Sequence, residues 1–128
     1  MSNENIKQLC DVVRECLFGL HKHFRHEHLE KIYENGLAHR LKKQGQVVVQ
    51  QAPVPVRDED GTLWGDLNAD LFVSDELIVE LKAVRATNDD HMAQLLGYLR
   101  GSSKRHGLLI NFGAAKLFIT RYVLDPLV

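Results

Sequence analysis

Residues 70–82, with the sequence DLFVSDELIVELK, contain two short apolar runs separated by a polar turn at residues 74–76. This pattern is typical of a tight β-hairpin. If the residues that flank the turn face each other across the two strands, Asp70 lies opposite Glu80. Alternate residues of a strand share a face, so Lys82 lies on the same side as this pair. The sequence therefore predicts a hairpin that brings two carboxylates and one amine together.

Like charges placed opposite one another destabilise a sheet, so the Asp70–Glu80 pair indicates a divalent cation. A magnesium-type site takes one or two carboxylates, several waters and a phosphate ligand. Protonated Lys82 cannot bind a metal, but it can hold an attacking water or neutralise charge that develops on a phosphate. This combination favours phosphodiester hydrolysis. The alternative is an exposed Glu80–Lys82 ion pair worth ~0–1 kcal/mol, and spacing alone favours neither interpretation.

The hydrophobic pattern of the remaining chain predicts a layered α/β protein. Apolar residues recur at three- and four-residue steps in three segments, which we expect to be helices: residues 4–24, 29–43 and 90–100. We expect strands in the valine-rich segment, the hairpin and the run GLLINF: residues 46–56, 66–84 and 107–112. Pro53 and Pro55 place the first strand at a sheet edge or end it, and residues 116–124 suit a last strand or a short helix. This order predicts a mixed sheet with helices packed against it.

The chain has 128 residues, which fits a single domain over residues 1–128. Its 16 Lys and Arg against 17 Asp and Glu exclude a strong non-specific nucleic-acid binder, but not an enzyme that contacts a few phosphates. No apolar run is long enough to span a bilayer, and the N-terminus lacks the apolar segment of a signal peptide. Cys10 and Cys16 lie six apart on an expected helix and face away from each other. We therefore expect a reduced, cytoplasmic protein with no membrane partner.

Several other segments follow one another at a characteristic spacing around the hairpin. They are Leu20-His-Lys22, Leu29-Glu30 with Tyr33 and Glu34, Leu41-Lys42-Lys43 with Gly45, Ala93-Gln94 with Tyr98-Leu99, and Gly107-Leu-Leu-Ile-Asn-Phe112. Together with Asp70 and the run Ile78-Val-Glu-Leu-Lys-Ala83, this pattern resembles the PD-(D/E)XK nuclease superfamily. More narrowly, the chain resembles the small bacterial GxxExxY proteins. The resemblance covers nearly the whole chain.

The resemblance implies a restriction-endonuclease-like three-layer core, in which a central mixed β-sheet is flanked by helices. It implies that Asp70 and Glu80 bind Mg²⁺ or Mn²⁺, with Glu30 as a further acidic ligand. Lys82 would be the catalytic lysine, and Gln94 the polar residue beside the catalytic site. On this basis we expect a divalent-metal-dependent nuclease that acts on DNA or RNA. The alternative is a nuclease fold used as a non-catalytic module that binds nucleic acid or protein.

The chain departs from the family pattern before the second helix. The name-giving glycine should stand three residues before Glu30, but Glu27 occupies that position, and Arg25-His26 replaces a turn that contains glycine and proline. The backbone freedom of this turn differs accordingly, and the direction of Glu30 depends on it. We expect Tyr33, which is kept, to be a core aromatic residue with a polar tip.

Three further expectations concern the surroundings of the site. The apolar stripe of residues 4–24 is longer than a small sheet needs, so we expect a homodimer. The four histidines between residues 21 and 28 do not share one helical face and have no cysteine among them, which favours a pH-sensitive surface over a zinc site. If the strand before the turn is regular, Asp66 and Asn68 share the face of Asp70 and support it.

Overall fold

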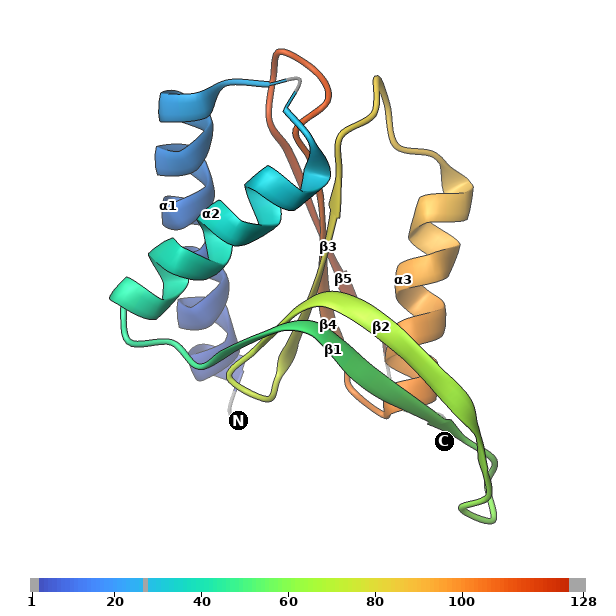
Figure 1. Ribbon diagram of the computed structural model, residues 1–128. Helices are drawn as coiled ribbons and strands as arrows, with labels where there is room; N and C mark the ends of the chain where they lie inside the picture. Colours follow the sequence, from blue (N-terminus) through green and yellow to red (C-terminus); the bar gives the residue numbers. More distant parts are fainter. Residues whose placement is uncertain (1–2, 27, 125–128) are drawn as a thin grey trace.

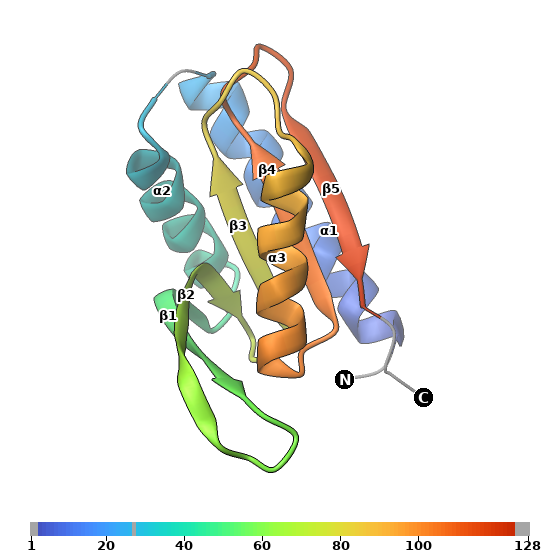
Figure 2. The ribbon, with the colours of Figure 1, turned by 90° about the vertical axis from the view of Figure 1, so that its right-hand side faces the viewer.

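The computed structural model describes residues 3–26 and 28–124 (Figure 1). The elements in chain order are α1 (Asn3–Phe24), α2 (Glu30–Lys43), β1 (Val48–Arg57), β2 (Leu63–Val73), β3 (Leu77–Lys82), α3 (Asp89–Ser102), β4 (His106–Asn111) and β5 (Phe118–Val123). The strands form one sheet in the order β1-β2-β3-β4-β5, in which β3 and β4 are parallel and the other neighbours antiparallel. Helices α1 and α2 cover one face of this sheet and α3 covers the other (Figures 1 and 2).

The strands extend further than the sequence pattern suggested at one point. Residues 57–65 lie between two segments that the sequence predicts as strands, but β1 and β2 extend into them and form one long antiparallel hairpin. Its tip is closed by a hydrogen bond from Asp58 N to Thr62 O of 2.9 Å, with Gly61 in the left-handed region at φ 88°. The predicted edge position of the proline-containing strand is confirmed, and the last segment is a strand rather than a helix.

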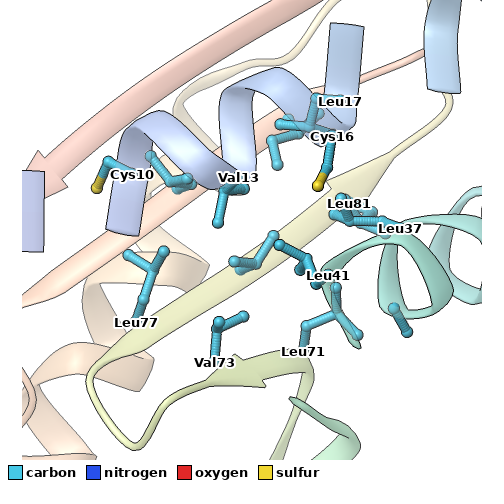
Figure 3. Packing of buried hydrophobic residues seen from close by; sticks show 14 of the residues in the cluster. Cys10, Val13, Cys16, Leu17, Leu37, Leu41, Leu71, Val73, Leu77 and Leu81 are labelled. Atoms are coloured by element: carbon cyan, nitrogen blue, oxygen red, sulfur yellow. The ribbon is translucent and has the colours of Figure 1, made fainter. Parts of the chain in front are cut away.

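The apolar stripe of α1 is buried between the sheet and α2 (Figure 3). Its buried members are Ile6, Leu9, Cys10, Val13, Cys16, Leu17 and Leu20. Each fully buried aliphatic side chain stabilises the fold by roughly 1.5–3 kcal/mol relative to an exposed one, which explains why a single small sheet uses the whole stripe. Because the stripe is covered within one chain, the reason given above for a homodimer is wrong.

The β1–β2 hairpin changes sides as it crosses the sheet. Val48 packs in the core on the α1 and α2 side, whereas Val54, on the same strand, packs against α3. In β2, Leu71 likewise packs on the α1 and α2 side and Ala69 on the α3 side. Residues of like parity share a face in a regular strand, so both strands must reverse their faces between these positions. Asp70 lies at the reversal.

The predicted shared face of Asp66, Asn68 and Asp70 depends on a regular strand, and β2 is not regular at Asp70. Both side chains are exposed on the hairpin arm, beyond the point at which the faces exchange. Regular alternation from Asp70 therefore does not hold, and the support of Asp70 by these two residues stays a prediction.

Candidate active site

The strands β2 and β3 pair next to their turn and then separate. The paired residues are Leu71 with Val79, Phe72 with Ile78 and Val73 with Leu77, which is the register that the sequence predicted. Beyond them, carboxylates replace backbone partners. Asp70 N donates to Glu80 Oε1 at 3.1 Å, and Leu81 N donates to Asp70 Oδ2 at 2.7 Å. The two acids thus converge where the ladder opens.

Glu80 is the most perturbed titratable group among the described residues. Its side chain is 3% exposed. Burial and, next, the charge of Asp70 raise the pKa of Glu80 to about 8. A hydrogen bond from the Asp70 backbone and the charge of Lys82 oppose this rise without cancelling it. Two neighbouring carboxylates cannot both ionise readily without a cation between or beside them.

Lys82 lies next to the acid pair and is held from α3. Its Nζ donates to Gln94 Oε1 at 3.1 Å, and Gln94 Nε2 donates to the hydroxyl of Tyr98 at 3.2 Å. Burial and then the charge of Glu80 raise the pKa of Tyr98, which places its hydroxyl in the electrostatic field of the acid pair. Gln94 and Tyr98 are four residues apart and therefore share one stripe of α3, but the sequence pattern indicates no role for the tyrosine.

Glu30 lies in the first turn of α2 and reaches the end of β3. Its Oε1 accepts a hydrogen bond from Ala83 N, one residue beyond Lys82, at 3.2 Å. Within residues 3–26 and 28–124, no three His, Cys, Asp or Glu side chains are grouped closely enough to hold a metal ion. The structure therefore brings Asp70 and Glu80 together. Glu30 lies nearby, where it binds the backbone at the end of β3.

Tyr33 fixes the turn that leads into α2. Helix α1 ends before Arg25, which takes a left-handed conformation at φ 62°. The Tyr33 hydroxyl donates to Arg25 O at 2.8 Å and accepts from His28 N at 3.1 Å, while its ring stacks on Phe112 with centroids 3.9 Å apart. This aromatic residue is buried with a satisfied hydroxyl, as expected, and it fixes the direction in which α2 begins. Glu27 itself lies outside the described residues.

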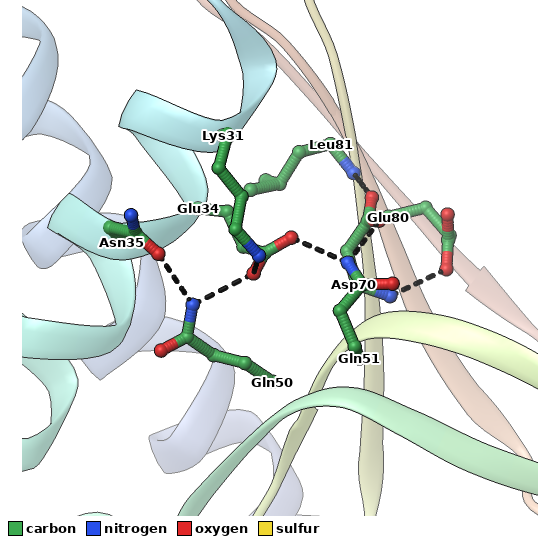
Figure 4. A network of polar contacts seen from close by, with 8 residues as sticks. All are labelled: Lys31, Glu34, Asn35, Gln50, Gln51, Asp70, Glu80 and Leu81. Carbon is green, nitrogen blue, oxygen red and sulfur yellow. Dashed lines mark hydrogen bonds and ion pairs between the residues drawn. The ribbon is translucent and has the colours of Figure 1, made fainter.

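Two residues without an assigned role in the sequence connect α2 to the acid pair. Glu34 is 4% exposed, and its carboxylate accepts hydrogen bonds from Lys31 Nζ at 2.8 Å, Gln50 Nε2 at 2.7 Å and Gln51 Nε2 at 2.6 Å (Figure 4). Gln51 Nε2 also donates to Asp70 Oδ1 at 3.4 Å. Glu34 follows Glu30 on α2 by four residues, and this spacing could have revealed its role in the site. Nothing in the sequence marks Gln51.

Asn111 ties together the two loops that follow the parallel strands. It lies beside Lys82 in the β3–β4 register and is buried. Its Oδ1 accepts from Val84 N at 3.1 Å and from Gly113 N at 2.9 Å. A Cβ atom on Gly113 would lie 2.0 Å from Val84 O, so these loops approach more closely than any side chain at this position allows. The carboxyl end of β3 is thereby held in one position.

Residues 7–122 match the family model of the PD-(D/E)XK nuclease superfamily. The chain belongs to this superfamily. Among solved structures, this PD-(D/E)XK protein is similar to the crystal structure of SSO0001, with a TM-score of 0.59 and 19% identity over 74% of this chain and 52% of that one. It also matches an alkaline exonuclease (LHK-Exo) from Laribacter hongkongensis, with a TM-score of 0.45 and 14% identity over 69% and 52% of the two chains. No curated protein matches the sequence significantly.

The family match confirms the superfamily that the sequence predicted, and the similarity to SSO0001 supports the restriction-endonuclease-like fold. The five-stranded mixed sheet with helices on both faces is the predicted three-layer core. The chain spans about half the length of the solved structures that it matches. The narrower assignment to the GxxExxY proteins stays a prediction. No helix in the described part of the chain is long and apolar enough to cross a membrane.

Proposed function

We propose that this PD-(D/E)XK protein is a divalent-metal-dependent nuclease that hydrolyses phosphodiester bonds in nucleic acid. The observation that carries the proposal is the convergence of the Asp70 and Glu80 carboxylates at the open end of the β2–β3 hairpin, with the Lys82 amine beside them. Membership of the superfamily supports nucleic acid as the substrate.

The donor set fits Mg²⁺ or Mn²⁺. Both ions take oxygen ligands, and Mg²⁺ in particular is bound by one or two carboxylates together with waters and phosphate oxygens. Asp70 and Glu80 would hold the ion, and Glu30 would join them by releasing the N–H of Ala83. When bound, the ion would polarise a phosphoryl oxygen and lower the pKa of a coordinated water.

Lys82 and Gln94 would act on the reacting phosphate from the α3 side. Gln94 Oε1 holds Lys82 Nζ at 3.1 Å, so the ammonium group has a fixed position next to the acid pair. An ammonium group placed there would orient the attacking water or stabilise negative charge that develops on the phosphate. Gln94 is in turn fixed by its hydrogen bond to Tyr98, which completes the support from α3.

We further propose that the chain forms one domain over residues 1–128 and acts in the cytoplasm. Cys10 and Cys16 are free and buried, and burial raises the pKa of both thiols, which suits a reducing compartment. A homodimer would have to form through a surface other than the α1 stripe, and light scattering of the purified protein would detect it.

A nuclease assay tests the proposed function. The protein is incubated with single-stranded, double-stranded and branched DNA and with RNA, in Mg²⁺, in Mn²⁺ and in EDTA. We expect cleavage that requires the metal, and a loss of about 10²–10³-fold or more in Asp70→Asn and Lys82→Ala. Asp66→Asn, an exposed change on the same strand, is the matched control and should keep full activity.

Two results would contradict the proposal. If activity survives Asp70→Asn or Lys82→Ala, the assigned site is wrong. If the wild-type protein binds nucleic acid but cleaves none of these substrates with either metal, the protein is a non-catalytic binding module.

A further inference from the structure

Gln51 adopts a left-handed backbone conformation in the middle of β1, at φ 50°. Residues with a side chain rarely take this conformation, and glycine or asparagine usually occupies such positions. A strained residue persists where the surrounding structure over-determines it, and such residues are concentrated at functional sites. We therefore expect contacts around Gln51 that stabilise this conformation.

The strain coincides with the place where β1 and β2 exchange faces. Gln50 pairs with Leu71, and Ala52 pairs with Ala69. Between these pairs Gln51 and Asp70 lie opposite each other without forming a ladder pair of their own. The left-handed residue in β1 thus faces the acid of β2 directly, and the two strands turn over at this position.

The side chain of Gln51 uses this position to bridge two carboxylates. Its amide nitrogen donates to Glu34 Oε1 at 2.6 Å and to Asp70 Oδ1 at 3.4 Å (Figure 4). Burial raises the pKa of Glu34, but hydrogen bonds from Lys31, Gln50 and Gln51 outweigh it, so this pKa is lowered overall. Glu34 is therefore a charged, fixed acceptor on a rigid helix, and it anchors the amide.

This bridge fixes the second oxygen of Asp70. Leu81 N holds Asp70 Oδ2 at 2.7 Å, and Gln51 Nε2 approaches Oδ1. Without the amide, the hydrogen bond from Leu81 N would hold only one oxygen of Asp70, and the carboxylate could rotate about that bond. A lysine or arginine here would form an ion pair that competes with a cation, whereas an amide orients the carboxylate and leaves its charge uncompensated.

We propose that Gln51, anchored by Glu34, is a positioning residue that holds Asp70 in the orientation in which it shares a divalent cation with Glu80. This inference rests on the proposed function, because it assumes that the acid pair binds a metal. Gln51 contacts neither the metal nor the substrate in this account and acts through Asp70. Hydrogen-bonded partners of metal ligands affect metal affinity by about 10–100-fold in other proteins, which sets the size of the effect expected here.

Calorimetric titration of Mn²⁺ into the intact protein tests the proposal without relying on activity. Gln51→Gly is the decisive variant, because glycine takes the left-handed conformation freely while the amide is deleted. Gln51→Asn tolerates the same backbone but carries a shorter side chain. Gln50→Ala is the matched control, because Gln50 also donates to Glu34 but does not contact Asp70.

We expect Gln51→Gly to bind Mn²⁺ about tenfold more weakly than wild type at an unchanged melting temperature. Gln51→Asn should bind comparably weakly, and Gln50→Ala within twofold of wild type. If Gln51→Gly matches wild type in Mn²⁺ affinity, or if Gln50→Ala weakens binding equally, Gln51 has no positioning role. If wild type itself binds no Mn²⁺, the metal-dependent function fails first, and this inference fails with it.

Discussion

The two strands of the β2–β3 hairpin are held together differently at its two ends. Next to the turn, apolar residues such as Val73 and Leu77 pair backbone to backbone and are fully buried. At the other end, the carboxylates of Asp70 and Glu80 take hydrogen bonds from the backbone of the opposite strand, and the ladder opens. The first arrangement maximises stability, whereas the second holds charge that is expensive to bury. A stretch of strand that gives up stability in this way is a candidate for function.

Replacement of Glu80 by glutamine should have the largest effect on stability. The carboxyl pKa is 4.5 in the unfolded chain and about 8 in the folded protein, so the folded state binds the proton more tightly. Stability therefore falls as pH rises from 4.5 to 8, by on the order of 5 kcal/mol in total. Glutamine is neutral at every pH, so the Glu80→Gln variant should not lose this stability as the pH rises.

Urea unfolding in EDTA at pH 5 and pH 9 measures this prediction. Wild type and Glu80→Gln should differ little at pH 5, and the variant should be more stable by several kcal/mol at pH 9. The same difference at both values would show that Glu80 is not held protonated by its surroundings. Asp66→Asn, on the exposed hairpin arm, is the control for a general effect of removing one negative charge.

At the closed end of the hairpin, Leu77→Ala should destabilise the protein by about 3 kcal/mol, within the range of 2–5 kcal/mol for a buried leucine. The change leaves a cavity in the core against α1. Its effect on Mn²⁺ affinity should be less than twofold, because the acid pair is fixed by its own hydrogen bonds. A large loss of Mn²⁺ affinity in the folded variant would mean that the two ends are not independent.

Tyr33→Phe tests whether the hydroxyl of this residue fixes the turn that precedes α2. The change removes the hydroxyl that joins Arg25 O and His28 N, and it should cost about 1–2 kcal/mol in the free energy of unfolding. The stacked ring against Phe112 remains, so the fold should persist. Stability equal to that of wild type in urea would show that the hydroxyl does not fix this turn.

A last prediction concerns the pH dependence of Mn²⁺ affinity. A metal binds the ionised form of Glu80, so binding below pH 8 must release one proton. The association constant should rise about tenfold for each pH unit from pH 6 to pH 8 and level off above it. Calorimetry in buffers of different ionisation enthalpy would count the proton directly. A pH-independent affinity would contradict the high pKa of Glu80.

Much of this arrangement could be predicted from local patterns. The helices and strands follow from the spacing of apolar residues, and the register that brings Asp70 near Glu80 follows from the short turn between β2 and β3. These features depend on residues close together in the sequence. The position of Gln94 next to Lys82 required a resemblance to a known family, because it joins two elements that are separated by a loop.

The remaining features could not be predicted because they arise from tertiary contacts. Gln51 has a left-handed backbone, although glycine or asparagine is the usual sequence signal for this conformation. The sequence pattern therefore predicts regular alternation and does not reveal the reversal at Asp70. Glu34 has the spacing of an ordinary helix-surface residue, but it is buried because Gln50 and Gln51 of β1 bind its carboxylate. The length of the β1–β2 hairpin was hidden by its polar composition.

The most direct test of the central claim is a crystal of the metal-free protein soaked in Mn²⁺ and measured for anomalous scattering. The account predicts one peak that contacts an oxygen of Asp70 and an oxygen of Glu80, in density that disappears in an Asp70→Asn crystal. The absence of a peak between these carboxylates at saturating Mn²⁺, or peaks confined to the surface histidines, would contradict the account.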